Sequence, residues 1–171
     1  MIGWKPMDER QLKLLEAHPQ SVFIFAHTSF LDFMVYLAYR NDFDIIKRRT
    51  RVLINPMFTD HFQWFLQHFG SIPATRREIR KGGATNRIIG HLETMDEFIF
   101  ALSPKGSTEA HHNWRSGFYH IASHFGCPVF PVGLDFEKQC LVIKDPFFVT
   151  DMTFEQAVQK GKDELYDIIP Y

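Results

Sequence analysis

Short, continuous apolar runs recur along the chain, separated by stretches in which apolar residues are spaced three or four positions apart. Runs of this length predict strands that are buried on both faces. They lie at Val22–Ala26, Val52–Ile54, Glu97–Leu102, Val129–Phe136 and Leu141–Ile143. Ser71–Thr75 is a further extended segment, and its Pro73 argues against a place in the middle of a sheet.

The stretches with helical spacing predict the helices. These are Asp8–Ala17, Phe30–Tyr39, Phe58–Phe69, Ala84–Met95, Gly117–Phe125 and Phe154–Ile168. Thr153 and Gln156 form a capping-box pattern at the start of the last helix, and Gly126 ends the helix before it. Because strands and helices alternate, we expect an α/β fold with a mainly parallel, mixed sheet covered by helices on both faces.

The length of the chain limits its organisation. With 171 residues, of which 45% are hydrophobic, it can bury one core and is too short for two ordinary domains. We therefore expect a single domain over residues 1–171, with residues 1–20 as a helical lead-in. No apolar stretch is long enough to cross a bilayer, and the N-terminus MIGWKPMDER lacks the apolar segment of a signal peptide.

Positive and negative charges nearly cancel, since there are 19 Lys and Arg residues and 20 Asp and Glu residues. Such a chain has no overall basic field, so we expect no nucleic-acid partner. The local basic run Lys47–Arg51 is interpreted as a solvated surface patch, with binding of an anionic group as the alternative.

The cysteines and histidines show no metal-binding pattern. Cys127 and Cys140 lack metal-type spacing, which favours free thiols in a reducing compartment and a cytoplasmic location. His120 and His124 are spaced for one helix face, but no carboxylate or cysteine lies at metal spacing from them, so we expect no metal. Neither cysteine has a neighbouring histidine that would activate it as a nucleophile.

The first candidate for chemistry is the pair His27 and Asp32, where the run Val22–Ala26 meets the helix Phe30–Tyr39. On one helix, residues five apart are separated by about 140° and do not share a face. If His27 instead ends the strand and Asp32 lies in the first helical turn, the carboxylate can orient the imidazole and leave its second nitrogen free as a base. The alternative is structural, because Ser29 and Asp32 also fit a capping box, with His27 as an ordinary turn residue.

Two later segments could bind an anion. GSIPATR ends in Arg76, whose guanidinium can clamp a phosphate, although a solvated basic surface is the alternative. SPKGST offers backbone N–H groups and hydroxyls, although plain turns share this composition. Its candidate anion-binding residues are Lys105, Gly106, Ser107 and Thr108.

In this order, HTSFLD, GSIPATR, SPKGST and VFPV resemble the four motif blocks of the glycerophospholipid acyltransferases. This family includes the lysophosphatidic acid and glycerol-3-phosphate acyltransferases, and HTSFLD resembles its H-x-x-x-x-D block. The segments WRSGFYHIA and VGLDF strengthen the resemblance, which runs from Ser21 to Val149. The set of blocks is specific, although no single block is.

The resemblance implies an O-acyltransferase of phospholipid biosynthesis. It would transfer an acyl group from a coenzyme A or acyl-carrier-protein thioester to the hydroxyl of a lysophosphatidate or glycerol phosphate-like acceptor. His27 would be the general base oriented by Asp32, and Arg76 with residues 105–108 would hold the phosphate. The thioester is a co-substrate, and no bound cofactor is implied. Peripheral contact with a membrane would involve the helix Phe58–Phe69, for which a place in the core is the favoured interpretation.

Four positions depart from the family pattern. Lys105 stands where the family has glutamate, Ser107 replaces the usual threonine, and Thr108 stands where arginine is typical. Thr75 precedes Arg76 where an acidic residue is usual. These departures leave two alternatives open: an acyltransferase for a different acceptor, or a lipid- or acyl-binding module without turnover.

Overall fold

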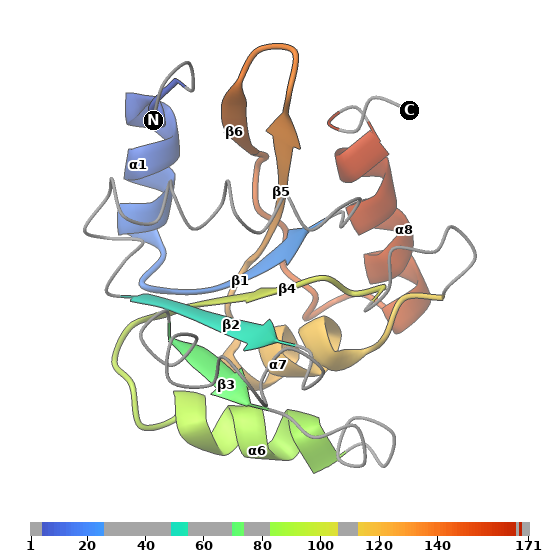
Figure 1. The fold of residues 1–171 in the computed structure, drawn as a ribbon. Coiled ribbons are helices and arrows are strands. Elements are labelled where there is room, and N and C mark those ends of the chain that lie inside the picture. Colours follow the sequence, from blue (N-terminus) through green and yellow to red (C-terminus); the bar gives the residue numbers. More distant parts are fainter. Residues whose placement is uncertain are drawn as a thin grey trace.

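The computed structural model describes residues 5–25, 49–54, 70–73, 83–105, 113–166 and 168. In these ranges the chain forms one six-stranded sheet in the order β3-β2-β4-β1-β5-β6 (Figure 1). The strands are β1 (Gln20–Phe25), β2 (Thr50–Ile54), β3 (Ser71–Pro73), β4 (Phe98–Leu102), β5 (Val129–Asp135) and β6 (Cys140–Ile143). Every neighbouring pair is parallel except β5 and β6, which are antiparallel. The expected α/β fold with a mainly parallel, mixed sheet is confirmed.

The described helices are α1 (Glu9–Ala17), α6 (Gly83–Leu92), α7 (Gly117–Phe125) and α8 (Phe154–Tyr166). The predicted capping box at α8 is present, since the Gln156 backbone N–H donates to Thr153 Oγ1 at 3.3 Å and the Thr153 N–H donates to Gln156 Oε1 at 2.8 Å. Gly126 ends α7 at φ 61°, a left-handed conformation that glycine adopts without strain. Within the described part of the chain, no helix is long and apolar enough to cross a membrane.

Two helices end earlier than their patterns predict: α8 ends at Tyr166 where Ile168 was expected, and α6 ends before Met95. α6 ends at Leu92, and the backbone N–H groups of Thr94 and Met95 bond to carbonyls three residues back, at 3.3 and 3.0 Å. This tighter turn keeps Met95 packed on the core without continuing the α-helix. The predicted helices Phe30–Tyr39 and Phe58–Phe69 lie outside the described residues, and the single domain over 1–171 stays a prediction.

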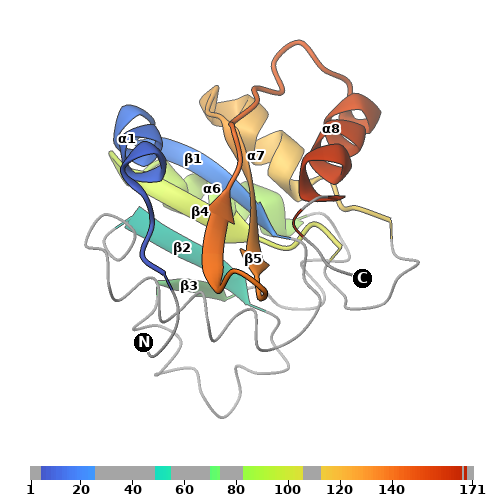
Figure 2. The same cartoon turned by 90° about the horizontal axis from the view of Figure 1, so that it is seen from above.

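Apolar side chains cover both faces of the sheet because residues along a strand alternate between them. In β1, Val22 and Ile24 join a cluster formed with α6, α7 and α8, whereas Phe23 joins Leu15 of α1 on the other face. All four are 0% exposed. α7 lies next to the start of α8 in both views (Figure 1, Figure 2). The rings of Phe118 in α7 and Phe154 in α8 are in contact there, with centroids 6.2 Å apart.

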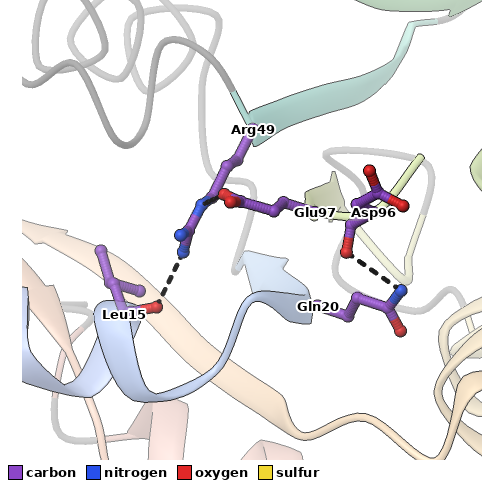
Figure 3. A network of polar contacts seen from close by, with 5 residues as sticks. All are labelled: Leu15, Gln20, Arg49, Asp96 and Glu97. Carbon is purple, nitrogen blue, oxygen red and sulfur yellow. Dashed lines mark hydrogen bonds and ion pairs between the residues drawn. The ribbon is translucent and has the colours of Figure 1, made fainter.

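The residues that precede the parallel strands form what we call the amino edge of the sheet: 19–20, 49, 96–97 and 126–128. Figure 3 shows its polar network, in which Arg49 forms an ion pair with Glu97 and donates from Nη1 to the Leu15 carbonyl at 3.1 Å. The Arg49 side chain is only 12% exposed. The solvated patch predicted for Lys47–Arg51 is therefore wrong for Arg49, because its cation reaches the carboxyl end of α1, where the helix dipole favours positive charge.

Candidate functional site

The parallel strands end at one edge of the sheet, which we call the carboxyl edge: Phe25, Ile54, Pro73 and Leu102, with the segments that follow them. In Figure 1 the arrowheads of β1 and β2 point to the same side of the molecule. Ligands of open parallel α/β sheets bind outside the carboxyl ends of the strands. Three of the predicted motif blocks continue from this edge.

The strands before the first and third blocks are direct neighbours. His27 and Asp32 follow β1, residues 105–108 follow β4, and Ile24 pairs with Leu102 in register. Adjacent strands are about 4.8 Å apart, so the chain leaves the sheet for both blocks from neighbouring positions. His27 and Asp32, together with Gly106, Ser107 and Thr108, lie outside the described residues.

The strand within the second block, β3, lies farther away. Arg76 follows β3, which is separated from β1 by β2 and β4, a distance of about 14 Å at the usual strand spacing. β3 lies at the end of the described sheet, which confirms the expectation from Pro73 that this segment is no central strand. Arg76 itself lies outside the described residues, so the structure relates only its strand to the others.

Lys105 is the one predicted site residue that the structure describes, and its backbone is held at the base of the loop that contains the third block. The Arg115 backbone N–H donates to the Pro104 carbonyl at 2.9 Å, so residues 103–105 and 113–115 lie beside each other. Lys105 is partly exposed and Arg115 is exposed. The bond closes the base of the loop and brings a second cation next to Lys105.

Trp114 anchors this loop base in the core. It is 9% exposed and packs edge-on against Phe118, with 5.7 Å between ring centroids. Gly161 of α8 makes room for it, because a Cβ at that position would lie 2.7 Å from Trp114 Cζ3 and 2.9 Å from Ile24 Cδ1. The residues on either side of Trp114 are thereby fixed relative to β1.

Two polar groups at this edge were not assigned a role from the sequence. Ser103 Oγ is buried and has no hydrogen-bond partner among the described residues. Arg115 lies ten residues beyond Lys105, in the segment WRSGFYHIA that was used only to support the resemblance. A basic residue just before the start of a helix is a sequence signal for an anion-binding residue. Only the hydrogen bond to Pro104, however, shows that Arg115 lies beside Lys105.

Neither cysteine is ionised near neutral pH. Burial raises the pKa of the Cys127 thiol to about 12, an effect that a backbone hydrogen bond only partly offsets. Cys127 lies at the amino edge, between α7 and β5. Burial also raises the pKa of Cys140. Because the thiolate is the nucleophilic form, both residues are poor candidates for a covalent acyl intermediate.

The histidines of α7 line a groove against α6. The groove has a volume of about 500 Å³, and His124 Nε2 lies 2.9 Å from Glu93 Oε1 beside it. Its lining residues are Thr85, Asn86, Ile89, Ser116, His120, Ser123 and His124. Within the described ranges, no three His, Cys, Asp or Glu side chains come together as metal ligands would.

Comparison with known proteins agrees with the resemblance of the motifs. A family model described as Acyltransferase matches residues 8–135, from the N-cap of α1 to the last residue of β5. The matched range includes His27, Asp32, Arg76 and residues 105–108. A comparison with curated proteins found no match. Since the family model covers well over half of the 171 residues, the chain belongs to the acyltransferase family, in agreement with its resemblance to the glycerophospholipid acyltransferases.

Proposed function

We propose that the protein transfers an acyl group from a coenzyme A or acyl-carrier-protein thioester to the hydroxyl of a lysophosphatidate or glycerol phosphate-like acceptor. His27 takes the proton of the acceptor hydroxyl, and Asp32 orients the imidazole. The acceptor oxygen attacks the thioester carbonyl, the carbon–sulfur bond breaks, and the leaving thiolate takes the proton back from His27. No acyl-enzyme and no bound cofactor take part.

The observation that supports this proposal most directly is that β1 and β4 are adjacent strands and both end at the carboxyl edge. The segment with His27 and Asp32 follows one of these strands, and the segment with Lys105 follows the other. A base and an anion-binding loop that start from adjacent strands can reach the hydroxyl and the phosphate of one small acceptor. The family match over residues 8–135 supports the acyl transfer itself.

The physical requirement of the reaction explains the residue types. An alcohol is a poor nucleophile until a positioned base removes its proton, a contribution of about 10²–10⁴ in rate. Arg76, Lys105 and the N–H groups of residues 106–108 supply positive charge for the acceptor's phosphate. We further propose that the enzyme works in the cytoplasm, with peripheral access to a membrane that supplies the lipid substrate.

The proposal is tested with His27→Ala. We expect this variant to lose acylation of lysophosphatidate and glycerol 3-phosphate while its circular dichroism spectrum and melting temperature stay unchanged. His91→Ala is the matched control, because His91 is exposed on α6 and no described side chain depends on its imidazole. Full activity of folded His27→Ala with either acceptor would exclude His27 as the base.

A different acceptor is the second candidate, and Lys105 in place of the family's glutamate is the observation that favours it. Release of free thiol from the acyl thioester is measured with a panel of phosphorylated and unphosphorylated alcohols and amines. Turnover only with unphosphorylated acceptors would replace the lysophosphatidate proposal. Binding of acyl thioester without turnover on any acceptor would indicate a binding module.

A further inference from the structure

We propose that Arg115 binds the phosphate of the acceptor together with Lys105. Arg115 then replaces the arginine that the family pattern has where this chain has Thr108. This inference rests on the proposed function and names a residue of the acceptor site outside the four motif blocks. Loss of one arginine within the loop is then offset by another at the base of the loop.

A backbone hydrogen bond brings the two basic residues together in the fold. The carbonyl of Pro104 belongs to the peptide group that joins Pro104 to Lys105, and it accepts the hydrogen bond of the Arg115 N–H at 2.9 Å. The backbones of Lys105 and Arg115 are therefore adjacent, although ten positions separate them in the sequence. Their place is fixed by Trp114, which is buried between α7, α8 and β1.

Both cationic side chains are at least partly exposed at the loop base formed by residues 103–105 and 113–115. Within the described part of the chain, neither the Lys105 ammonium nor the Arg115 guanidinium has an ion-pair or hydrogen-bond partner. Arg49 and Arg10, in contrast, form ion pairs with Glu97 and Asp145. Two like charges repel each other at short range, and a dianionic phosphate bound between them removes that repulsion.

The start of α7 adds to the positive character of this place. Arg115 directly precedes Ser116, the N-cap of α7, whose side chain makes no capping hydrogen bond. The first-turn N–H groups of a helix carry partial positive charge and commonly bind phosphate. A phosphate held by Lys105 and Arg115 lies close to these groups, and the guanidinium can grip two of its oxygens at once.

The test compares Arg115→Gln, Arg115→Lys and the control Arg10→Gln. We expect Arg115→Gln to raise KM for the phosphorylated acceptor by about 10- to 100-fold, because the charge-assisted contact of the guanidinium with the phosphate is lost. The kcat value and the KM for the acyl thioester should stay within about twofold, because His27 and the thioester site keep their groups. Arg115→Lys retains the charge and recovers part of the affinity, and Arg10→Gln behaves as wild type.

A second measurement separates this inference from the proposed function. Glycerol 3-phosphate binding is measured by calorimetry on the unmodified protein and on each variant, without any thioester present. One outcome is that the wild type binds glycerol 3-phosphate but transfers no acyl group, and that Arg115→Gln weakens this binding. It would support the phosphate site and overturn only the proposed acyl transfer. If Arg115→Gln leaves KM and glycerol 3-phosphate binding unchanged, Arg115 does not bind the phosphate, although acyl transfer stands. If the wild type shows neither binding nor transfer, the phosphate site and the proposed function are both overturned.

Discussion

The two edges of the sheet use polar residues in opposite ways. At the amino edge, polar groups bond to one another: Arg49 joins Glu97 and the Leu15 carbonyl, and Gln20 Nε2 donates to the Asp96 carbonyl at 3.3 Å (Figure 3). At the carboxyl edge, Lys105 and Arg115 are held by their backbones alone, with no side-chain partner among the described residues. A satisfied network adds stability, whereas groups without partners keep their bonding capacity for a ligand.

The comparison explains why the two edges can change independently. Residues at the amino edge connect α1, β2 and β4, so changes there act on the free energy of unfolding. Residues at the carboxyl edge are continuous in sequence with the segments that carry the predicted base and phosphate-binding residues, so we expect changes there to act on substrate binding and turnover.

Asp32→Asn tests the carboxyl edge most strongly. The amide keeps the shape of the carboxylate but cannot stabilise the imidazolium, so we expect kcat to fall by about 10²–10⁴. The melting temperature should change little. Glu97→Gln at the amino edge is the opposite case and should lower stability while keeping kcat. A normal kcat for Asp32→Asn would remove this residue from the mechanism.

Gly161→Ala tests whether packing connects the core to the carboxyl edge. The added Cβ meets the Trp114 ring at 2.7 Å and the Ile24 side chain at 2.9 Å, and both side chains are buried, so the ring has little room to move away. Gly90→Ala makes the same change on an exposed position of α6, where the new Cβ meets no atom of the described residues within 4 Å beyond its own helix backbone and chain neighbours. We expect the two variants to differ by about 3 kcal/mol in unfolding free energy, measured in urea.

Because Trp114 precedes Arg115, Gly161→Ala should also raise KM for the acceptor. Equal stability of the two alanine variants would show that α8 moves away from Trp114 without cost. An unchanged KM in a destabilised Gly161→Ala would show that the loop base does not depend on this packing.

Arg49→Gln tests the amino edge. It removes an ion pair and a charge-assisted hydrogen bond from a side chain that is only 12% exposed, so we expect a loss of about 2 kcal/mol in unfolding free energy. Arg10→Gln breaks the exposed pair with Asp145 and should cost less than about 1 kcal/mol. The specific activity of the folded Arg49→Gln enzyme should be unchanged, and a large drop in kcat would contradict the division between the edges.

Cys127 gives the amino edge a pH dependence. The pKa of its thiol is about 12 in the folded protein, against an ordinary value of 9.0. Between pH 9 and 12, the unfolded chain therefore loses a proton that the folded protein keeps. Stability therefore falls as pH rises from 9 towards 12, by about 1.4 kcal/mol per pH unit. Cys127→Ala should lack this part of the slope, which denaturation at several pH values measures. Parallel curves for both proteins would contradict the buried thiol.

The smallest expected effect concerns two buried hydroxyls, Ser21 Oγ in β1 and Ser103 Oγ after β4, which have no partner among the described residues. Removing either hydroxyl removes an unsatisfied polar group, so Ser21→Ala and Ser103→Ala should leave stability unchanged or raise it by about 1 kcal/mol. Reduced activity in Ser103→Ala alone would extend the functional edge to that hydroxyl. A clear loss of stability in either variant would show that the hydroxyl has a partner.

Much of the fold follows from local patterns in the sequence. The apolar runs predicted the strands, and the turn chemistry of Thr153, Gln156 and Gly126 predicted where α8 begins and α7 ends. Local rules succeed here because strand alternation and helix caps depend on residues close in sequence. The ends of α6 and the burial of Arg49 were not predicted, because a tighter final turn and a cation bound to α1 depend on packing between distant segments.

The sequence by itself determined the fold class, the order of the motif blocks and the resemblance to the acyltransferases, because these depend on residue types and their spacing. Only the tertiary structure decided that β1 and β4 are neighbours and that the backbones of Arg115 and Lys105 lie beside each other. Strand order and backbone contacts between distant segments arise from burying both faces of one sheet at once. No local pattern specifies such long-range pairings, and they are what bring a second cation to the proposed acceptor site.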